Sequence, residues 1–319
     1  MNSVLHLDDQ TIDSLLDPDS VTGAIAAAFV AWGRGEAATT QRVRAAASGQ
    51  MSSAMAAVVP PFSGGKLYAT NRGVFTFVMV LFDAEGRLLC TLDGDVVTRL
   101  RTPAASALAI RALAAPDSKR AAVIGAGRQG WSHLQMLATE LPDLEHVAVS
   151  SREPELTAEI VDRARATGIP AVAEATATEA IEGADVVVTI TSSIEPLFPA
   201  SAVGDRTLLC AVGATKYDRR ELDAATVARC AAVVCDDVVG SRNECGDLIQ
   251  AAAEGAFKWE RAIELRDVVA GNVSVDRAGR APVLFETQGV AIQDVAVAAL
   301  AYQRYSQSSS ATSSREGIR

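Results

Sequence analysis

Apolar and polar positions follow different periods in the two parts of the chain. In the first part, the helical spacing of apolar residues over positions 11–32 predicts one or two amphipathic helices. Apolar runs at 79–82 and 88–92 flank a turn at 83–86, which predicts a β-hairpin. The first part of the chain is therefore expected to be an α+β lobe.

A further helix is predicted at positions 104–115, where the sequence is rich in alanine. Thr102 is a good N-cap residue, Pro103 suits a first helical turn, and Pro116 stops the helix. This helix would lead out of the first lobe.

From Arg120 onward, short apolar runs alternate with helical periods. Such runs are apolar on both faces, which is typical of parallel strands covered by helices on both sides. The sequence therefore predicts an α/β fold, a Rossmann doubly wound parallel sheet, after the α+β lobe. The predicted strands are 121–124, 146–150, 185–190, 207–212 and 231–235.

The end of the chain combines an apolar helix with a polar tail. Residues 289–305 are predicted to be helical, and the serine-rich residues 306–319 are expected to be flexible.

The segment after the strand at 121–124 carries a complete GxGxxG pattern in Gly125, Gly127 and Gly130. The first glycine permits a tight turn, the second lets backbone N–H groups approach a pyrophosphate, and the third allows close packing of helix and strand. Arg128 and Gln129 lie between them. Flavin and S-adenosylmethionine sites use similar loops, but the alternating strands favour a nicotinamide dinucleotide.

The end of the second strand indicates which coenzyme is bound. NAD sites usually have an acidic residue about 20 residues after the glycines, whereas this chain has Ser151 and Arg152 there. A guanidinium can pair with a 2′-phosphate, so NADP(H) is favoured over NAD(H). Glu153 argues for the opposite preference, and Arg152 as a solvated surface residue is the alternative.

Two later strand ends contribute further candidates for the cofactor site. Thr191 and Ser192 follow one predicted strand, and Val212 and Gly213 end the next. Because ligands of Rossmann folds lie at the carboxyl edge of the sheet, we expect these residues at the nicotinamide end. Ordinary turns of small residues would produce the same pattern.

Composition excludes several classes of function. The net charge of −10 and the isoelectric point near 4.9 disfavour a broad surface for nucleic acid or anionic lipid. The most apolar early stretch, 23–32, is shorter than the roughly 20 residues of a membrane span, and no secretory signal begins the chain. We therefore expect a cytoplasmic protein. Its five cysteines form no CxxC pair, which predicts free thiols and no metal site.

Three cations stand among small or apolar residues: Arg44, Lys66 and Arg101. Taken singly, each of these three residues would be interpreted as an ordinary surface cation. Together with the glycine pattern and with 211–223, 244–247 and 289–294, they resemble the ornithine cyclodeaminase/μ-crystallin family over roughly residues 40–305.

This resemblance implies an organisation of the chain. Residues 1–112, completed by the helix at 289–305, would form a substrate-binding and dimerisation lobe, so a homodimer is expected. Residues 113–288 would be the Rossmann dinucleotide-binding domain.

The resemblance also implies roles for single residues. Arg44 and Arg101 would hold the substrate carboxylate, with Arg42 competing for the role of Arg44. Lys66 would be the cation beside the reacting carbon, and Thr76 a polar wall of the substrate site.

The helix at 289–305 and the loops before it add further expectations. Asp294 would orient Lys66 or an arginine, or else stabilise its own helix. Glu221 and Asp223 are expected to cap the helix that follows them.

One position departs from the cyclodeaminases. These carry an aspartate near the distal amine of their substrate, and the matching position here is Thr215, which is no base. The chain therefore looks closer to the ketimine reductase/μ-crystallin branch.

The sequence-based hypothesis is the NAD(P)H-dependent reduction of a C=N bond next to a carboxylate, from a cyclic ketimine such as pyrroline-2-carboxylate or an imino acid to an L-amino acid. Lys66 would supply the proton, Arg101 and Asp294 would assist it, and the partner would be this small substrate. The alternatives are an ornithine or lysine cyclodeaminase, an alanine dehydrogenase, and a non-catalytic NADPH-binding protein like μ-crystallin.

Overall fold

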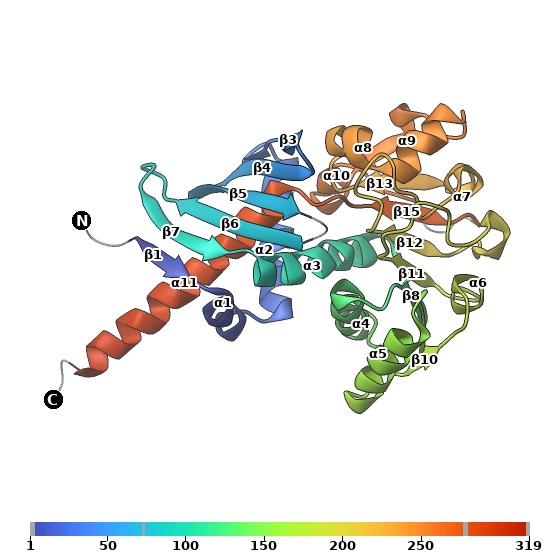
Figure 1. The fold of residues 1–319 in the computed structure, drawn as a ribbon, viewed down its shortest axis with the longest axis horizontal. Coiled ribbons are helices and arrows are strands. Elements are labelled where there is room, and N and C mark those ends of the chain that lie inside the picture. Colours follow the sequence, from blue (N-terminus) through green and yellow to red (C-terminus); the bar gives the residue numbers. More distant parts are fainter. Residues whose placement is uncertain (1–3, 72–73, 277–279, 317–319) are drawn as a thin grey trace. The chain divides into compact units, whose positions relative to one another are not determined.

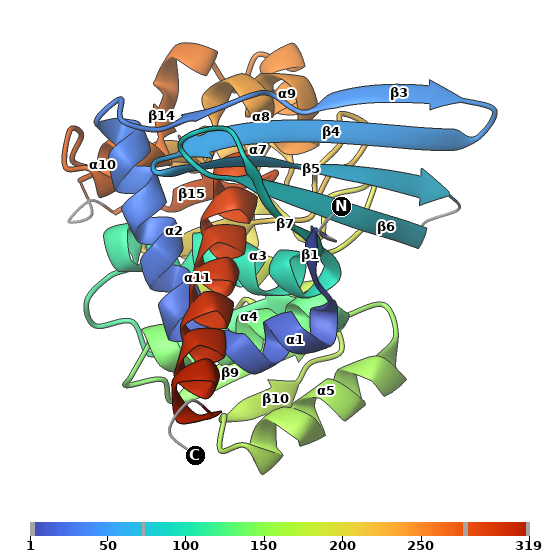
Figure 2. The same cartoon turned by 90° about the vertical axis from the view of Figure 1, so that its left-hand side faces the viewer.

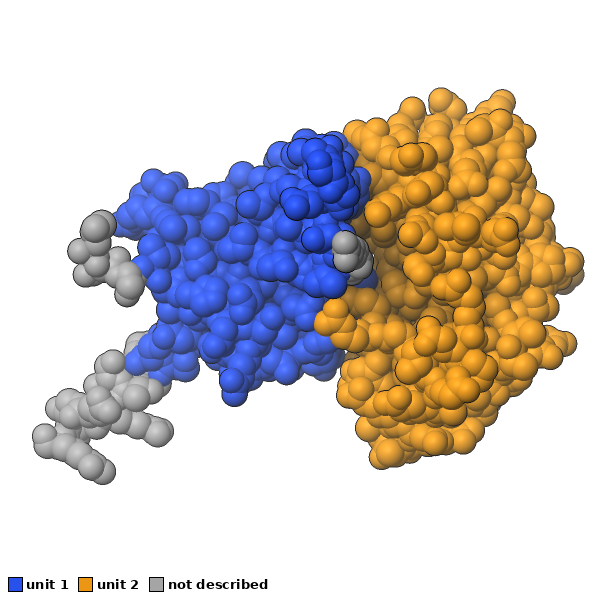
Figure 3. Space-filling model, viewed as in Figure 1, with its two compact units in different colours: residues 1–104, 290–319 blue, residues 105–289 orange. Residues whose placement is uncertain are grey.

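The structure is a computed structural model that describes residues 4–71, 74–276 and 280–316, with the side chains of 310–316 excepted. The chain forms two compact units, which Figure 3 shows in different colours. Unit 1 consists of residues 1–104 and 290–319, and unit 2 of residues 105–289. No helix among the described residues is long and apolar enough to cross a membrane.

Unit 1 is built on a seven-stranded sheet with the order β1-β7-β6-β5-β4-β2, and β3 pairs with β4 (Figure 1). Only β1 runs parallel to its neighbour β7 among the described pairs of this sheet. The strands are β1 (Leu5–Leu7), β2 (Ala38–Thr39), β3 (Val43–Ala47), β4 (Gln50–Val59), β5 (Phe62–Asn71), β6 (Val74–Phe82) and β7 (Leu88–Asp93).

The predicted hairpin is confirmed as β6 and β7, whose turn is closed by Asp83 N–H donating to the carbonyl of Arg87. The prediction missed the long strands β3, β4 and β5. These strands are rich in alanine, serine and glycine, residues that give little periodic signal and have weak strand preference. Pairing between neighbouring strands determines their conformation.

Helices cover one face of this sheet. Figure 2 shows α2 (Pro18–Gly33) and α11 (Ala291–Glu316) side by side, and α11 packs on β4, β5 and β6. With α1 (Asp9–Leu15), α2 confirms the helices predicted at 11–32. The last helix continues to Glu316 instead of ending at residue 305. Once a helix has formed, each residue added to its end gains a backbone hydrogen bond, so extension costs little. The predicted flexible tail includes residues 317–319, which lie outside the described residues.

The helix that links the units is longer than predicted. It is α3 (Asp95–Leu113), and it begins before Pro103 instead of at it. Proline lacks an N–H, so it removes one helical hydrogen bond from this helix. The Thr102 hydroxyl donates to the carbonyl of Thr98 instead of capping a helix end. The predicted N-cap is therefore wrong, because packing stabilises the helix across the proline.

Unit 2 is a parallel eight-stranded sheet of order β10-β9-β8-β11-β12-β15-β13-β14. Its first five strands have the order 3-2-1-4-5 of a Rossmann fold, so the predicted fold class is confirmed. The strands are β8 (Arg120–Ile124), β9 (His146–Ser150), β10 (Ala171–Ala173), β11 (Val186–Thr189), β12 (Leu208–Ala211), β13 (Ala232–Cys235), β14 (Ala262–Glu264) and β15 (Val283–Glu286). The prediction missed β10, β14 and β15.

Consecutive residues of the central strands are buried on both faces of this sheet. Alternate side chains from β8, β11 and β12 form one core with residues of the helices that follow the later strands. The helices of unit 2 are α4 (Arg128–Glu140), α5 (Pro154–Ala166), α6 (Ala177–Ala180), α7 (Ala224–Arg229), α8 (Val238–Glu244), α9 (Gly246–Ala253) and α10 (Leu265–Val269), with short 3-10 turns at Ala200–Ala202 and Trp259–Arg261.

Candidate functional site

The glycine turn of unit 2 has the geometry of a phosphate cradle. Gly125 has a φ of 127°, and a Cβ there would lie 2.5 Å from the carbonyl oxygen of Ile190. At Gly130, a Cβ would lie 2.0 Å from the carbonyl oxygen of Gly125. Only glycine fits both positions, since one needs left-handed backbone and the other allows no side chain.

Gly127 serves a different purpose. It is the N-cap of α4, and a Cβ built on it would meet nothing within 4 Å. Its backbone therefore faces open space at a helix N-terminus, where free N–H groups attract an anion. This is the room that a dinucleotide pyrophosphate needs, so the residues present fit that group.

A cavity of about 510 Å³ adjoins the cradle, and only unit 2 lines it. Its wall includes residues 124–127, 150–153 and 190–193. The ends of β8, β9 and β11 thus meet at one cavity. Arg128 and Gln129 begin α4 beside the cradle and are not among the described residues that line the cavity.

The end of β9 has the arrangement that the sequence suggested. Ser151, Arg152 and Glu153 all line the cavity, and the last two are exposed. The Ser151 hydroxyl accepts a hydrogen bond from the N–H of Glu153 at 3.1 Å, which fixes the turn. Both a cation and an anion are therefore available at the place where a ribose would lie.

The ends of β11 and β12 contribute unequally to this cavity. Thr191 and Ser192 line it, whereas Val212 and Gly213 do not and Val212 is buried. Gly213 has no room for a side chain, because a Cβ would lie 2.2 Å from the carbonyl oxygen of Thr191. Gly213 thus allows the two loops to approach each other.

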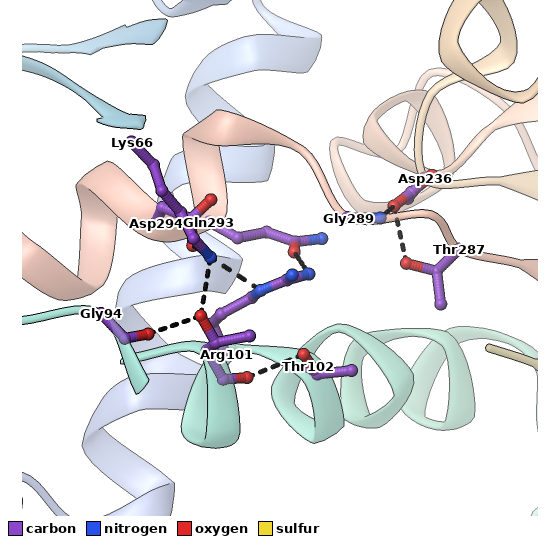
Figure 4. Close-up of polar contacts among 10 residues, drawn as sticks. Lys66, Gly94, Arg101, Thr102, Asp236, Thr287, Gly289, Gln293 and Asp294 are labelled. Carbon is purple, nitrogen blue, oxygen red and sulfur yellow. Dashed lines mark hydrogen bonds and ion pairs between the residues drawn. The ribbon is translucent and has the colours of Figure 1, made fainter. Parts of the chain in front are cut away.

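Unit 1 holds a separate cluster of charged side chains, shown in Figure 4. Lys66 of β5 is 4% exposed, and its Nζ donates to Thr98 Oγ1 at 2.6 Å and to Asp294 Oδ1 at 3.1 Å. The Thr98 hydroxyl donates in turn to the carbonyl of Gly94. Lys66 is thereby held from α3 and from α11 at once.

Burial lowers the pKa of Lys66 to about 8, against the opposing effect of Asp294. The positive charges of Arg101 and Arg42 contribute to this lowered pKa. The Nζ also lies 4.5 Å from the centre of the Phe77 ring. An ammonium with such a pKa can both keep and release a proton near neutral pH.

Arg101 lies next to Lys66 in the same cluster. Its Nη1 donates to Gln293 Oε1 at 2.8 Å, and its Nε lies 3.7 Å from Asp294 Oδ1. Among the described residues, Arg101 Nε, Gln293 Nε2 and Asp294 Oδ2 are buried without a hydrogen-bond partner. Buried polar atoms that lack partners are costly, so these atoms mark a place where a polar ligand would bind.

The two candidates for the first carboxylate clamp differ in position. Arg44 is exposed on β3, opposite Ser53. Arg42 precedes β3, is partly buried, and its charge reaches Lys66. The structure therefore brings Arg42 into the electrostatic surroundings of Lys66.

Thr76 does not join the cluster. It pairs with Ala69 on β5, three positions along the ladder from the pair of Lys66 and Met79. Successive side chains of a strand point to opposite faces, so Thr76 lies on the exposed face and Lys66 on the covered one. The predicted polar wall is corrected accordingly.

Thr215 lies in the loop after β12 of unit 2, where its N–H donates to the carbonyl of Gly213 at 2.9 Å. Its side chain is partly exposed, and the acid nearest in sequence, Asp218, is exposed.

The sequence analysis missed two residues that the structure singles out and gave a third, Glu221, the wrong role. Thr98 and Gln293 belong to the Lys66 cluster, and the spacing of Thr98 and Arg101 on one helix face could have indicated the first. Glu221 does not cap a helix but is fully buried, accepting hydrogen bonds from the Thr191 and Gly213 amides. Asp223 is the N-cap of α7, as predicted.

The Rossmann unit with its phosphate cradle and the buried lysine-arginine cluster define a dinucleotide-dependent oxidoreductase that acts on a small carboxylate. The chain belongs to the ornithine cyclodeaminase/mu-crystallin family, whose model matches residues 4–309. The resemblance inferred from the sequence is thus confirmed.

Three relatives illustrate this membership. The chain is 35% identical over 240 residues to a Delta(1)-pyrroline-2-carboxylate/Delta(1)-piperideine-2-carboxylate reductase of Azospirillum brasilense, covering 75% of this chain and 72% of that protein. It is 33% identical over 316 residues to the iminosuccinate reductase of Paracoccus denitrificans, covering 92% and 94%. The Thermococcus litoralis Delta(1)-pyrroline-2-carboxylate reductase, solved in complex with NADH and L-proline, superposes with a TM-score of 0.90 at 27% identity, covering 96% and 98%.

Proposed function

We propose that this protein is an NAD(P)H-dependent reductase of a C=N bond next to a carboxylate, which converts a cyclic ketimine or an open imino acid into an amino acid. The observation that carries the proposal is Lys66, a buried ammonium with a pKa near 8 beside Arg101. Relatives named for reduction of pyrroline-2-carboxylate and of iminosuccinate support it.

Arg101 would bind the substrate carboxylate. A guanidinium offers several donors in a fixed plane, and Nε of Arg101 is still without a hydrogen-bond partner among the described residues. The hydrogen bond to Gln293 holds the guanidinium in place at 2.8 Å. A fixed carboxylate orients the adjacent C=N carbon, and orientation contributes a large part of catalysis. Arg42, whose charge reaches Lys66, would assist.

Lys66 would supply the proton. Reduction of an imine adds a hydride to carbon and a proton to nitrogen, and a reduced nicotinamide in the unit 2 cavity supplies the hydride when bound. Asp294 and Thr98 hold the Nζ of Lys66 by two hydrogen bonds, so the third N–H can point to the substrate nitrogen. Asp294 also keeps enough positive charge on Lys66 for it to carry the proton.

We further propose a preference for NADP(H). Arg152 lines the cavity at the end of β9, where an aspartate or glutamate would otherwise repel a 2′-phosphate. Glu153 lines the same cavity and weakens this preference, so the expected discrimination is modest.

We also propose that the protein is a homodimer. The face of the unit 1 sheet opposite the helices exposes large apolar side chains, and contiguous apolar surface of this kind marks an interface. A second copy of the chain would cover it. The exposed residues are Val43, Val58, Leu67, Val74 and Val78.

The five cysteines are free and buried. Free thiols suit a reducing compartment, and we propose the cytoplasm on this ground.

A panel of imines tests the proposed function. The purified protein should oxidise NADPH or NADH with Δ1-pyrroline-2-carboxylate, Δ1-piperideine-2-carboxylate or iminosuccinate. The Lys66→Met variant should bind the coenzyme and turn over none of them. Conversion of ornithine to proline and ammonia without net coenzyme oxidation would identify a cyclodeaminase instead. Coenzyme binding without any turnover would favour a binding protein.

A further inference from the structure

A buried carboxylate lies beneath the dinucleotide cavity of unit 2, and the reaction proposed above gives it no role. It belongs to Glu221, in the segment between β12 and α7, and its side chain is 0% exposed. Burying a charge is costly unless hydrogen bonds compensate it. The partners of this carboxylate therefore indicate its purpose.

Three donors converge on Glu221. Its Oε2 accepts from the Thr189 hydroxyl at 2.9 Å and from the Gly213 N–H at 2.7 Å, and its Oε1 accepts from the Thr191 N–H at 2.6 Å. Thr189 ends β11, Thr191 follows it, and Gly213 follows β12. One side chain thus joins the carboxyl ends of two adjacent strands.

The joined segments include the wall of the cavity. Residues 190–193 line it, and Thr191 is held by its backbone through Glu221. The Glu221 carboxylate also packs closely against Gly213, where an added Cβ would lie 2.6 Å from Cδ of Glu221. Movement of this carboxylate would therefore move the wall of the dinucleotide site.

A second carboxyl group holds Glu221 itself. Oδ1 of Asp247 accepts from the backbone N–H of Glu221 at 2.7 Å and from that of Leu222 at 2.9 Å. Burial, followed by the charge of Glu221, raises the pKa of Asp247 to about 8. Oδ2 of Asp247 has no hydrogen-bond partner among the described residues, whereas both oxygens of Glu221 accept hydrogen bonds. Burial raises the pKa of Glu221 as well, and the hydrogen bonds from Thr191, Gly213 and Thr189 oppose this by favouring its ionised form.

We propose that Glu221 is a positioning residue of the dinucleotide site, whose ionised carboxylate fixes residues 190–193 against the Gly213 loop. The inference rests on the proposed function, because it needs a dinucleotide in that cavity. Glu221 touches neither substrate nor coenzyme in this role. It acts through the backbone of Thr191 and Gly213.

Titration calorimetry with NADPH and NADH tests the inference. The Glu221→Gln variant places an amide N–H₂ against donors, so its coenzyme Kd should rise about tenfold or more, as expected for loss of charge-assisted hydrogen bonds. Thr189→Val removes one donor, and its Kd should rise severalfold. Thr189→Ser keeps the hydroxyl and should restore the Kd of the parent protein.

A matched control uses another buried carboxylate of the same unit. Asp236 is 1% exposed and accepts from the Thr287 hydroxyl and the Gly289 N–H (Figure 4). It is not among the described residues that line the cavity. Asp236→Asn should lower the melting temperature and leave the coenzyme Kd unchanged. An equal rise of Kd in this control would overturn the inference, since general loosening would then explain the effect.

The remaining outcomes separate the two proposals. Should Glu221→Gln fail to fold, the comparison of Thr189→Val with Thr189→Ser decides. If the parent binds coenzyme and the folded variants bind it within twofold, the role of Glu221 is refuted and the proposed function stands. If the parent protein binds neither coenzyme, the proposed function and this inference are both refuted.

Discussion

Removing the charge of Asp294 provides a direct test of Lys66 as the proton donor. In the Asp294→Asn variant, the negative charge 3.1 Å from Lys66 Nζ is lost while the shape of the side chain is kept. The pKa of Lys66, about 8, reflects a raising effect of Asp294 against the lowering effects of burial, Arg101 and Arg42. An opposite charge this close shifts a pKa by roughly one to three units. Lys66 in the variant should therefore titrate at roughly pH 5 to 7.

The sign of the effect on activity follows from the role of the proton. Lys66 must be protonated to act as donor, so kcat/KM for the imine should be constant below the pKa of Lys66 and fall above it. In the parent protein the fall should be centred near pH 8. In Asp294→Asn it should move to lower pH by roughly one to three units, and kcat/KM near neutral pH should decrease accordingly.

The assay is the initial rate of coenzyme oxidation at low imine concentration, followed from about pH 5 to about pH 9.5, because kcat/KM reports the titration of the free enzyme. Asp13→Asn is a suitable control, since it removes a surface ion pair with Arg99 of α3 and leaves the Lys66 cluster intact. Its profile should match that of the parent. An alkaline limb that stays near pH 8 in Asp294→Asn would refute Lys66 as the donor.

Three further predictions concern the substrate, the coenzyme and the assembly. Arg101→Lys keeps the charge but loses the planar donor set, so kcat/KM for the imine should fall roughly tenfold to a hundredfold with an unchanged coenzyme Kd; calorimetry that shows weaker coenzyme binding would contradict this. Arg152→Ala should weaken NADPH roughly tenfold or more and NADH little, as charge-assisted bonds to a phosphate predict; equal losses in fluorescence titrations would argue against a 2′-phosphate contact. The Leu67→Asp/Val78→Asp double variant should sediment as a monomer, whereas Val239→Asp, the same change at an exposed valine of α8, should sediment like the parent; an unchanged dimer in the double variant would exclude that sheet face as the interface.

The sequence alone determined the Rossmann unit and its cradle. Strands buried on both faces give unbroken apolar runs, and β8, β9, β11, β12 and β13 were predicted within a residue or two on this basis. Gly125 and Gly130 were predicted because their backbone needs are local: a positive φ at one and contact with the preceding turn at the other. A pattern of neighbouring residues records such local requirements.

Tertiary structure alone decided which polar side chains meet. Lys66 and Asp294 are 228 residues apart, and the packing of α11 on the unit 1 sheet brings them together. The sequence offered Asp294 two roles, and nothing in its helix favoured one. The same holds for Glu221, whose expected capping role gave way to contacts with the ends of two strands.

Which face of the sheet a side chain occupies is another property that only strand pairing determines. Thr76 was predicted as a polar wall of the substrate site, and the register of β5 with β6 places it on the face opposite to that of Lys66. Register is set by strands that carry small residues and little periodic signal, so a sequence pattern could not fix it. Local chemistry thus identified the cofactor cradle, whereas long-range packing arranged the buried charges, because charges distant in sequence are brought together only by the fold as a whole.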